Sequence, residues 1–205
     1  MSESNKNGQA GDFFSESELL HTGCRVKGMD LKPESLPLFT TTAFTMNSLT
    51  EVKATYANKG YTYVRTRNPN RTALAEAISY LEHGEKSLIF SSGMGAITST
   101  LLALHSAGDH ILCNSNIYGE TFMVMTTVLN RLGMEVDLVN FEDLEQVRKS
   151  VKPNTRLLYT EVVSNPTLSM CDIRALADIA HATGARLMVD NTFTTPISIR
   201  PLDFG

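Results

Sequence analysis

From Arg71 to Asp190, the sequence alternates short apolar runs with longer segments in which apolar residues recur at helical spacing. The apolar runs fall at residues 87–90, 110–113, 134–139, 156–161 and 186–190, and the helical segments at 71–81, 97–105, 119–132, 142–150 and 172–183. Strands that alternate with amphipathic helices are typical of a parallel sheet covered by helices on both faces. The sequence therefore predicts an α/β fold over this part of the chain.

The segments on either side lack this alternation. Residues 1–18 are polar and are expected to form a flexible leader. Residues 19–70 have weak periodicity and several turn-forming residues, which favours an extended arm, packed on its own domain or laid across a partner subunit. Between Asp190 and Gly205 no further element is expected. Because a doubly wound sheet normally continues, we expect residues 71–205 to be a domain cut in mid-fold.

Composition excludes several other classes of protein. The formal net charge is -4, and no dense stripe of Lys and Arg indicates nucleic-acid binding. Three scattered cysteines without a CxxC pair argue against a disulfide framework and against a metal site, and favour a reducing compartment. The N-terminus lacks the pattern of a signal peptide, and no segment is apolar enough to span a bilayer. The expected location is the cytoplasm.

The segment Ser91-Ser92-Gly93-Met94-Gly95 is the first candidate site. It joins a predicted strand to a predicted helix through small residues, so the N–H groups of Gly93 and Met94 would point outward at a helix N-terminus. Unpaired N–H groups and the helix dipole together favour a phosphate there. A tight turn without a ligand explains the segment equally well. It is neither a GxGxxG dinucleotide motif nor a Walker loop.

Asp190 and Tyr118 are candidates because Asp190 closes a predicted strand and Tyr118 follows one. Asp190 would lie at the carboxyl edge of the parallel sheet, where α/β proteins bind ligands, and could pair with a protonated pyridine nitrogen. The alternative is an Asp that caps the next turn. Tyr118 could stack on a planar cofactor ring, or it could simply pack beneath a loop.

Two further candidates lie in segments predicted as loops or extended chain. Tyr63 and Arg65 are two residues apart, so on extended backbone both side chains can point the same way and bind a phosphate. A solvated basic segment is the alternative. Asn165 follows a predicted strand and could donate to a ring oxygen, although Asn-Pro is also a common turn.

Taken in order along the chain, these motifs resemble those of one enzyme family. The order is Tyr-x-Arg-x-x-Asn-Pro, Ser-Ser-Gly-Met, Tyr-Gly, Glu-x-x-x-Asn-Pro and Val-Asp-Asn-Thr. This pattern resembles the Cys/Met-metabolism family of pyridoxal-phosphate (PLP) enzymes, which includes cystathionine γ-synthase, the cystathionine lyases, methionine γ-lyase and the O-acylhomoserine sulfhydrylases. The resemblance covers residues 35–205, and the run 91–101 is most similar to methionine γ-lyase. It implies a PLP fold type I large domain, as in aspartate aminotransferase.

The resemblance also implies roles for matching residues. Tyr118 would stack on the pyridine ring and assist proton transfer to the leaving group. Tyr63 and Arg65 would reach the cofactor phosphate of a neighbouring subunit, which implies a homodimer or tetramer. Glu161 would support the site. The residues implied to bind the cofactor are Tyr63, Arg65, Ser92, Gly93, Met94, Tyr118, Asn165, Asp190 and Thr192.

The sequence departs from the family pattern at two places. Glu120 stands where methionine γ-lyases carry Cys, so the synthases and sulfhydrylases stay open. The lysine that forms the Schiff base would follow Gly205, and the last lysine, Lys152, precedes the strand that ends at Asp190. The C-terminal domain, with the arginine that binds the substrate carboxylate, is also absent. This chain alone is therefore expected to be inactive, and a separate chain could supply the missing part.

The implied chemistry is γ-elimination or γ-replacement on methionine, cystathionine or an O-acylhomoserine, and the sequence does not choose among these or β-cleavage. Two alternatives are a non-catalytic partner or remnant subunit, and another fold-type-I PLP enzyme such as an aminotransferase. The pair formed by Tyr63 and Arg65 argues against the aminotransferase.

Overall fold

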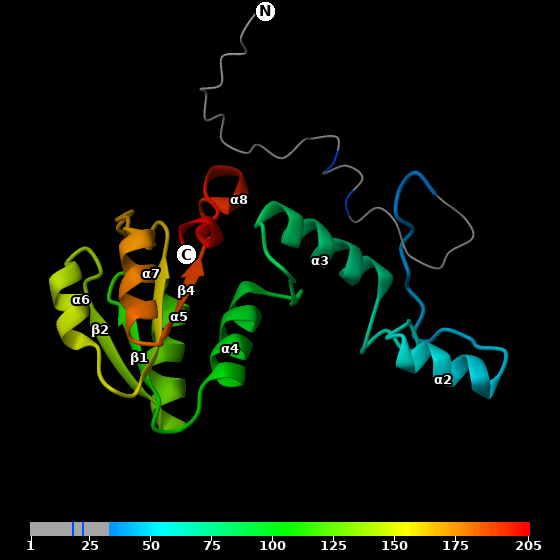
Figure 1. Ribbon diagram of the computed structural model, residues 1–205, viewed down its shortest axis with the longest axis horizontal. Coiled ribbons are helices and arrows are strands. Elements are labelled where there is room, and N and C mark those ends of the chain that lie inside the picture. Colours follow the sequence, from blue (N-terminus) through cyan, green and yellow to red (C-terminus); the bar gives the residue numbers. More distant parts are fainter. Residues whose placement is uncertain (1–17, 19–21, 23–32) are drawn as a thin grey trace, which may run out of the picture. The chain divides into compact units, whose positions relative to one another are not determined.

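The computed structural model describes Glu18, Thr22 and residues 33–205, and Figure 1 gives the order of the elements. Most of the predicted leader, the start of the predicted arm and Cys24 lie outside these residues. The chain divides into two compact units, residues 1–88 and 89–205, and each is described by itself. The division into an arm over 19–70 and a large domain over 71–205 stays a prediction.

A parallel sheet forms the centre of the second unit. Its strands are β1 (His110–Asn114), β2 (Glu135–Val139), β3 (Thr155–Glu161) and β4 (Arg186–Asp190), in the order β2-β1-β3-β4. In the register of β3 and β4, Glu161 pairs with Asp190, so the last residues of these two strands are neighbours. The strands predicted at these four places and their parallel arrangement are confirmed.

Helices cover both faces of this sheet. They are α4 (Gly93–Leu104), α5 (Gly119–Met123) with the π-helix Val124–Leu129, α6 (Leu144–Ser150) and α7 (Ile173–Ala182). Strand β1 is buried throughout: Ile111 and Cys113 join a core cluster with residues of α4 and the π-helix, whereas Leu112 joins a second cluster with residues of α6 and α7. Because neighbouring strand residues point to opposite faces, this alternation shows that both faces are buried.

Two local expectations were wrong, and a third element differs from the expected one in detail. Residues 87–90 are not a strand, and Leu88 is 83% exposed. A strand needs a partner, and no described segment pairs with this run. The helix expected over 119–132 is present, but its hydrogen bonding changes from α to π at Val124. After Asp190 the chain forms two short helices, α8 (Thr195–Ser198) and the 3₁₀ helix Pro201–Phe204, each with a proline in its first turn, where the fixed φ of proline suits a helix.

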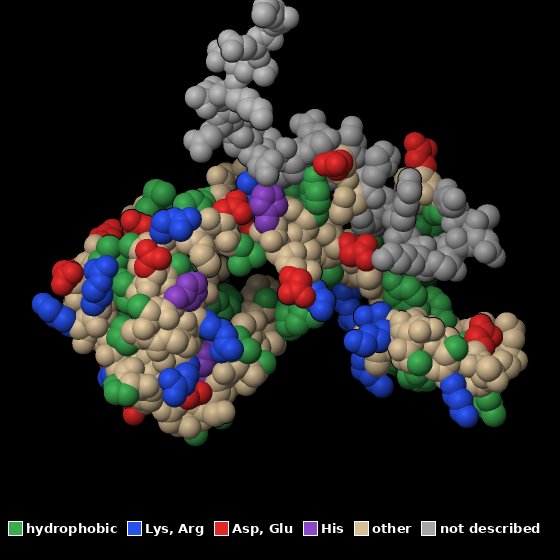
Figure 2. Space-filling model, viewed as in Figure 1, with side chains coloured by type: hydrophobic (Ala, Val, Ile, Leu, Met, Phe, Trp, Pro, Cys, Tyr) green, Lys and Arg blue, Asp and Glu red, His purple; other side chains and the backbone are tan. Residues whose placement is uncertain are grey.

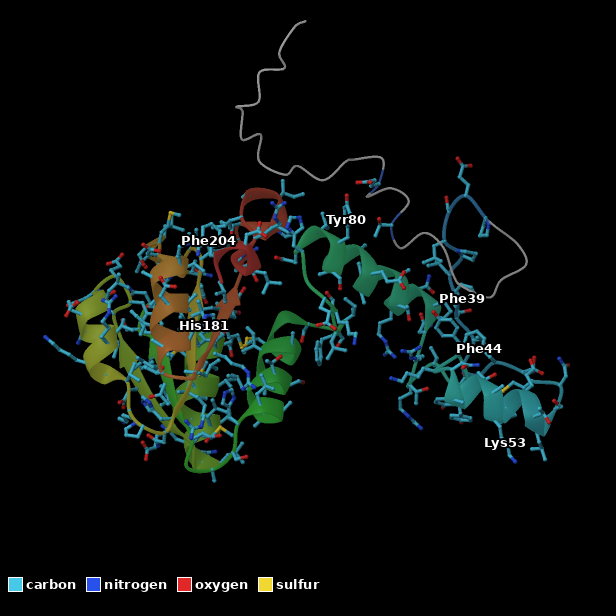
Figure 3. The ribbon with its side chains drawn as sticks, in the orientation of Figure 1. Phe39, Phe44, Lys53, Tyr80, His181 and Phe204 are labelled. Carbon is cyan, nitrogen blue, oxygen red and sulfur yellow. The ribbon has the colours of Figure 1, made fainter. Side chains whose placement is uncertain are left out.

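The C-terminal 3₁₀ helix packs against α7. The Arg174 guanidinium lies 5.6 Å from the centroid of the Phe204 ring, and its Nη2 donates to the Asp203 carbonyl over 3.0 Å. Phe204 and His181 are labelled in Figure 3. On the face seen in Figure 2, acidic and basic side chains are interspersed over the helices of this unit.

Within residues 33–88, the first unit forms the helices α2 (Leu49–Ala57) and α3 (Pro69–Leu81). Helix α2 lies where an extended arm was expected. It buries no residue, so its sequence carries little of the apolar stripe that predicts a helix. Its start is nevertheless capped, because the Ser48 hydroxyl accepts from the Glu51 N–H over 3.1 Å and the Glu51 carboxylate accepts from the Asn47 N–H over 2.6 Å.

Side chains at the start of α3 bind the preceding chain. The Asn70 amide accepts from the Phe39 N–H and donates to the Pro37 carbonyl, both over 2.8 Å, and Asn68 donates to the Phe39 carbonyl over 3.1 Å. The Phe39 and Phe44 rings, labelled in Figure 3, lie with centroids 6.4 Å apart. No helix within the described part of the chain has the length and apolar character needed to cross a bilayer.

Candidate active site

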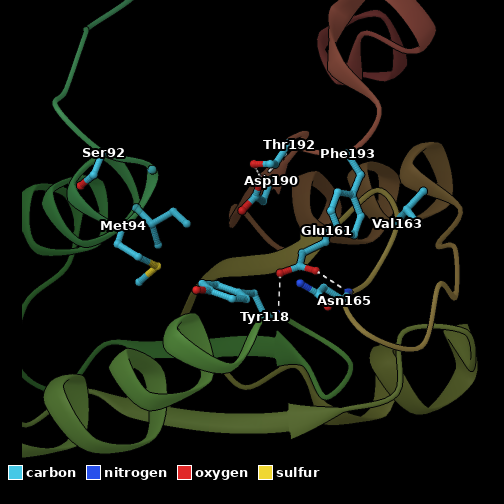
Figure 4. A pocket seen from close by; sticks show the side chains of 11 residues that line it. Ser92, Met94, Tyr118, Glu161, Val163, Asn165, Asp190, Thr192 and Phe193 are labelled. Carbon is cyan, nitrogen blue, oxygen red and sulfur yellow. Dashed lines mark hydrogen bonds between the residues drawn. The ribbon is translucent and has the colours of Figure 1, made fainter.

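A pocket of about 350 Å³ opens in the second unit where the strands end. Its wall comes from the start of α4 and from the loops that follow β1, β3 and β4, as the close-up in Figure 4 shows. The carboxyl edge of a parallel sheet is the usual place for a ligand in an α/β protein. The lining residues are Ser92, Gly93, Met94, Ile97, Tyr118, Glu161, Val163, Asn165, Asp190, Thr192 and Phe193.

The N-terminus of α4 presents free donors to this pocket. The Ser92 hydroxyl caps the helix by accepting from the Gly95 N–H over 3.0 Å. The N–H groups of Gly93 and Met94 have no acceptor among the described residues. A Cβ added at Gly93 would meet no atom within 4 Å, so the pocket is open beside this backbone. Two free N–H groups at the positive end of a helix suit a phosphate.

Tyr118 lies on the loop between β1 and α5. Its side chain is 41% exposed and makes no capping bond to α5, so its ring is available to a ligand in the pocket. Its backbone N–H donates to Glu161 Oε1 over 2.7 Å, and the N–H of Asn165 donates to Glu161 Oε2 over 3.1 Å. Both bonds use backbone groups, and the Tyr118 ring and the Asn165 side-chain amide line the same pocket.

Two carboxylates end β3 and β4 side by side. Glu161 is only 5% exposed, and burial raises the pKa of its carboxyl group, as does the negative charge of Asp190, while the two backbone N–H bonds lower it. Asp190 binds Thr192 through Oδ1 alone, which accepts from the Thr192 N–H over 3.0 Å and from its hydroxyl over 2.5 Å. The second oxygen of Asp190 has no partner among the described residues and is available to a cationic ligand group.

Every predicted site residue of the second unit lines this one pocket. Tyr63 and Arg65 belong to the first unit, where the backbone forms a turn and not the expected extended segment, because the Thr66 N–H donates to the Tyr63 carbonyl over 3.0 Å. The Arg65 guanidinium nevertheless lies 4.9 Å from the centroid of the Tyr63 ring. The apolar lining residues Val163 and Phe193 were not predicted. Each follows a predicted strand by two or three residues, which is the only sequence signal that could have found them.

None of the lysines that the structure describes lines the pocket. Lys152 lies at the opposite, amino edge of the sheet, before β3. There its Nζ is 2.8 Å from Asp137 Oδ2 and 3.6 Å from Glu135 Oε2, on the edge strand β2. Its position therefore agrees with the prediction that it does not replace the lysine that forms the Schiff base.

The donor set fits a phosphorylated, protonated aromatic ring. The free N–H groups of α4 suit its phosphate, the Tyr118 ring suits its face, and the free oxygen of Asp190 suits a ring N–H. The volume lies within the range of small-molecule sites, which are mostly apolar with a few convergent polar groups. PLP has these chemical features.

Comparisons with known proteins point to the same cofactor. Residues 16–205 match the family model described as Cys/Met metabolism PLP-dependent enzyme. Cystathionine gamma-lyase of Bacillus subtilis (strain 168) is 47% identical over 146 residues, 71% of this chain and 38% of that protein. Cystathionine beta-lyase MetC of the same strain is 41% identical over 190 residues, 93% of this chain and 47% of that protein. This chain thus spans about half the length of both curated relatives.

A solved structure shares the fold. A Campylobacter jejuni protein, named for O-acetylhomoserine (thiol)-lyase activity and solved with N′-pyridoxyl-lysine-5′-monophosphate, superposes with a TM-score of 0.86 at 28% identity, over 95% of this chain and 48% of that one. This superposition confirms the predicted α/β fold of PLP fold type I, and this chain covers about half of that protein. On the sequence match and the shared fold, the chain belongs to the family of Cys/Met metabolism PLP-dependent enzymes.

Proposed function

We propose that this chain provides the PLP-binding half of an enzyme that acts on sulfur amino acids, as a C–S lyase or a γ-synthase. One observation carries the proposal: the N-terminus of α4, the exposed ring of Tyr118 and the free oxygen of Asp190 line a single pocket. The family and the two Bacillus subtilis relatives support the reaction class.

Each lining group has a proposed task. The backbone N–H groups of Gly93 and Met94 bind the phosphate, and the Ser92 hydroxyl caps the helix that carries them. Asn165 donates to the ring oxygen from the loop after β3. Thr192 holds Asp190 through two hydrogen bonds to Oδ1, which keeps the other oxygen directed at the ring nitrogen.

The chemistry follows from the charge at the ring nitrogen. The bound cofactor supplies an electron-accepting ring that stabilises negative charge on the substrate carbon. Asp190 keeps a proton on the ring nitrogen, because an ionised carboxylate beside an N–H favours the protonated ring. Tyr118 stacks on the ring and donates a proton to the leaving group from its hydroxyl. Because one relative is a gamma-lyase and the other a beta-lyase, the bond cleaved, the substrate and the choice between elimination and replacement stay open.

The first unit supports a proposal about assembly. Arg67 donates to the Lys59 carbonyl, and Arg71 donates to the carbonyls of Arg65 and Thr66, so these two arginines are used to hold the turn. Arg65 is exposed and stacks on Tyr63. We propose that Tyr63 and Arg65 bind the cofactor phosphate of a neighbouring copy in a homodimer or tetramer. A separate chain with the remaining half and a cytoplasmic location belong to the same proposal.

One observation favours a second candidate function, that of a non-catalytic partner or remnant subunit. No lysine among the described residues lines the pocket, so this chain by itself has no amine there to hold the cofactor covalently. In that case the chain would bind the phosphate or a full-length copy without turning over a substrate.

The protonation state of the ring nitrogen tests the proposed function. The probe is pyridoxamine 5′-phosphate labelled with ¹⁵N in the ring, whose amine does not condense with lysines. In wild type we expect saturable binding and a protonated ring nitrogen at neutral pH, and in Asp190→Asn a deprotonated one, because the amide carries no charge. Asp178→Asn, at an exposed position of α7, is the control for the change in net charge. A wild-type chain that leaves the bound ring nitrogen unprotonated would contradict the proposal.

A further inference from the structure

The last residue of β3 connects two loops of the pocket. Glu161 Oε1 accepts the N–H of Tyr118, and Oε2 accepts the N–H of Asn165; Figure 4 draws both bonds. Tyr118 belongs to the loop after β1, whereas Asn165 belongs to the loop after β3. One buried carboxylate therefore binds two separate loops, one with each oxygen.

Both donors are backbone groups, so the side chains of Tyr118 and Asn165 stay available to the pocket. We infer that Glu161 is a positioning residue: its carboxylate fixes the separation of the two loops, and with it the separation of the Tyr118 ring from the Asn165 amide. The consequence for a bound cofactor ring rests on the proposed function. The link between the loops rests on the hydrogen bonds alone.

The chemistry of this contact requires an acid with two equivalent acceptor oxygens. An ionised carboxylate accepts at both oxygens, whereas a Gln side chain has one acceptor and one NH₂ donor, which would face a second N–H donor. An Asp at this position is shorter by a methylene group and would not reach both loops. No neutral side chain of the same shape can therefore make both bonds.

Folding does not favour the charged form of Glu161. Burial and the adjacent charge of Asp190 raise the pKa of Glu161, so the charged form is less favourable in the folded chain than in the unfolded chain. The stability linked to a raised carboxyl pKa is present below the unfolded pKa and is lost as pH rises through the folded one. At neutral pH the charge thus costs stability, and the hydrogen bonds from the Tyr118 and Asn165 N–H groups offset part of that cost.

Amide NMR of the ligand-free, ¹⁵N-labelled chain tests this inference. We expect the amide resonances of Tyr118 and Asn165 to shift with one common midpoint, at a pH above the usual range of a glutamate carboxyl, because burial raises the pKa of Glu161. The other titratable groups near Glu161 are Asp190, Cys113 and Tyr159. Burial raises the pKa of the Cys113 thiol and of the Tyr159 phenol above their ordinary, already alkaline values, so neither group titrates together with a carboxyl. Repeating the titration in Asp190→Asn separates the remaining carboxylate from Glu161.

In Glu161→Gln we expect the common pH-dependent shift to disappear, and at least one of the two amides to exchange with solvent about tenfold faster or more, as the loss of a charge-assisted hydrogen bond implies. Glu120→Gln is the matched control, because Glu120 is exposed and lies on the Tyr118 side of the pocket without bonding the Asn165 loop. The common midpoint should persist in this variant.

Separate midpoints for the two amides in wild type, or two amides that keep their slow exchange in Glu161→Gln, would overturn the inference. If Glu161→Gln fails to fold, the wild-type titration decides alone. The experiment contains no cofactor. If the chain binds no pyridoxamine 5′-phosphate but its two amides titrate with a common midpoint, only the proposed function is contradicted. If the chain binds pyridoxamine 5′-phosphate but the two amides titrate with separate midpoints, only the positioning role of Glu161 is contradicted.

Discussion

A substitution at Gly93 can distinguish an effect on phosphate binding from an effect on the stability of the fold. A Cβ at Gly93 would meet no atom within 4 Å, and its φ lies outside the left-handed region. Gly→Ala at such a position stabilises a protein by about 0.4–1 kcal/mol, mainly because alanine restricts the unfolded chain. We therefore expect Gly93→Ala to fold normally, with an unchanged or slightly higher free energy of unfolding in urea.

Ligand binding should respond in the opposite direction. The new methyl group would stand in the open space beside the N–H groups of Gly93 and Met94, where the phosphate is proposed to bind. Losing one hydrogen bond to a charged group costs about 1.5–3 kcal/mol. This loss corresponds to a dissociation constant for pyridoxamine 5′-phosphate that is about ten to 150 times higher, measured by isothermal titration calorimetry.

Gly119→Ala is the matched control. Gly119 is also the first residue of its helix, a Cβ there would also meet no atom within 4 Å, and it does not line the pocket. The two variants should gain stability equally and differ in affinity. A folded Gly93→Ala chain that binds the probe as well as wild type, or a Gly119→Ala chain that loses as much affinity, would refute the phosphate site at α4.

Three further predictions concern the core, the response to pH and the absent lysine. Leu101→Ala, at a fully buried position of α4, should lower the free energy of unfolding by about 2–5 kcal/mol. Leu104→Ala, at a position of the same helix that is 46% exposed, should lower it clearly less. Equal losses in urea unfolding would show that α4 does not pack as described. Burial and the charge of Lys152 lower the pKa of His110, although Asp137 acts in the opposite direction, so His110 binds a proton more readily in the unfolded chain than in the folded one. The free energy of unfolding should therefore fall as pH drops below about 6.5, by at most about 1.4 kcal/mol per pH unit for this one group. His110→Gln should lose the part of this pH dependence that His110 causes, and an unaltered slope in the variant would contradict the assignment. The chain incubated with PLP and treated with borohydride should carry no stoichiometric, site-specific lysine adduct at the pocket, and mass spectrometry that finds one would contradict the prediction.

The sequence determined the framework and most of the site. Apolar runs of strand length, alternating with helical stripes, were enough to predict the parallel strands, because periodicity is a local property of the chain. The site followed from the same reasoning. Asp190 ends one parallel strand and Tyr118 lies on the loop after another, and parallel strands end at a common edge, so these residues had to converge there. Order along the chain thus sufficed to predict proximity in space.

Only the tertiary structure decided what depends on partners distant in sequence. Residues 87–90 have the composition of a strand but form none, because no described segment pairs with them. Lys152 lies at the amino edge, where Asp137 on β2 binds it. Glu161 was expected only to support the site, yet its carboxylate bonds Tyr118, 43 positions earlier in the chain. A hydrogen bond between separate loops depends on how the strands are brought together, and local sequence does not encode that arrangement.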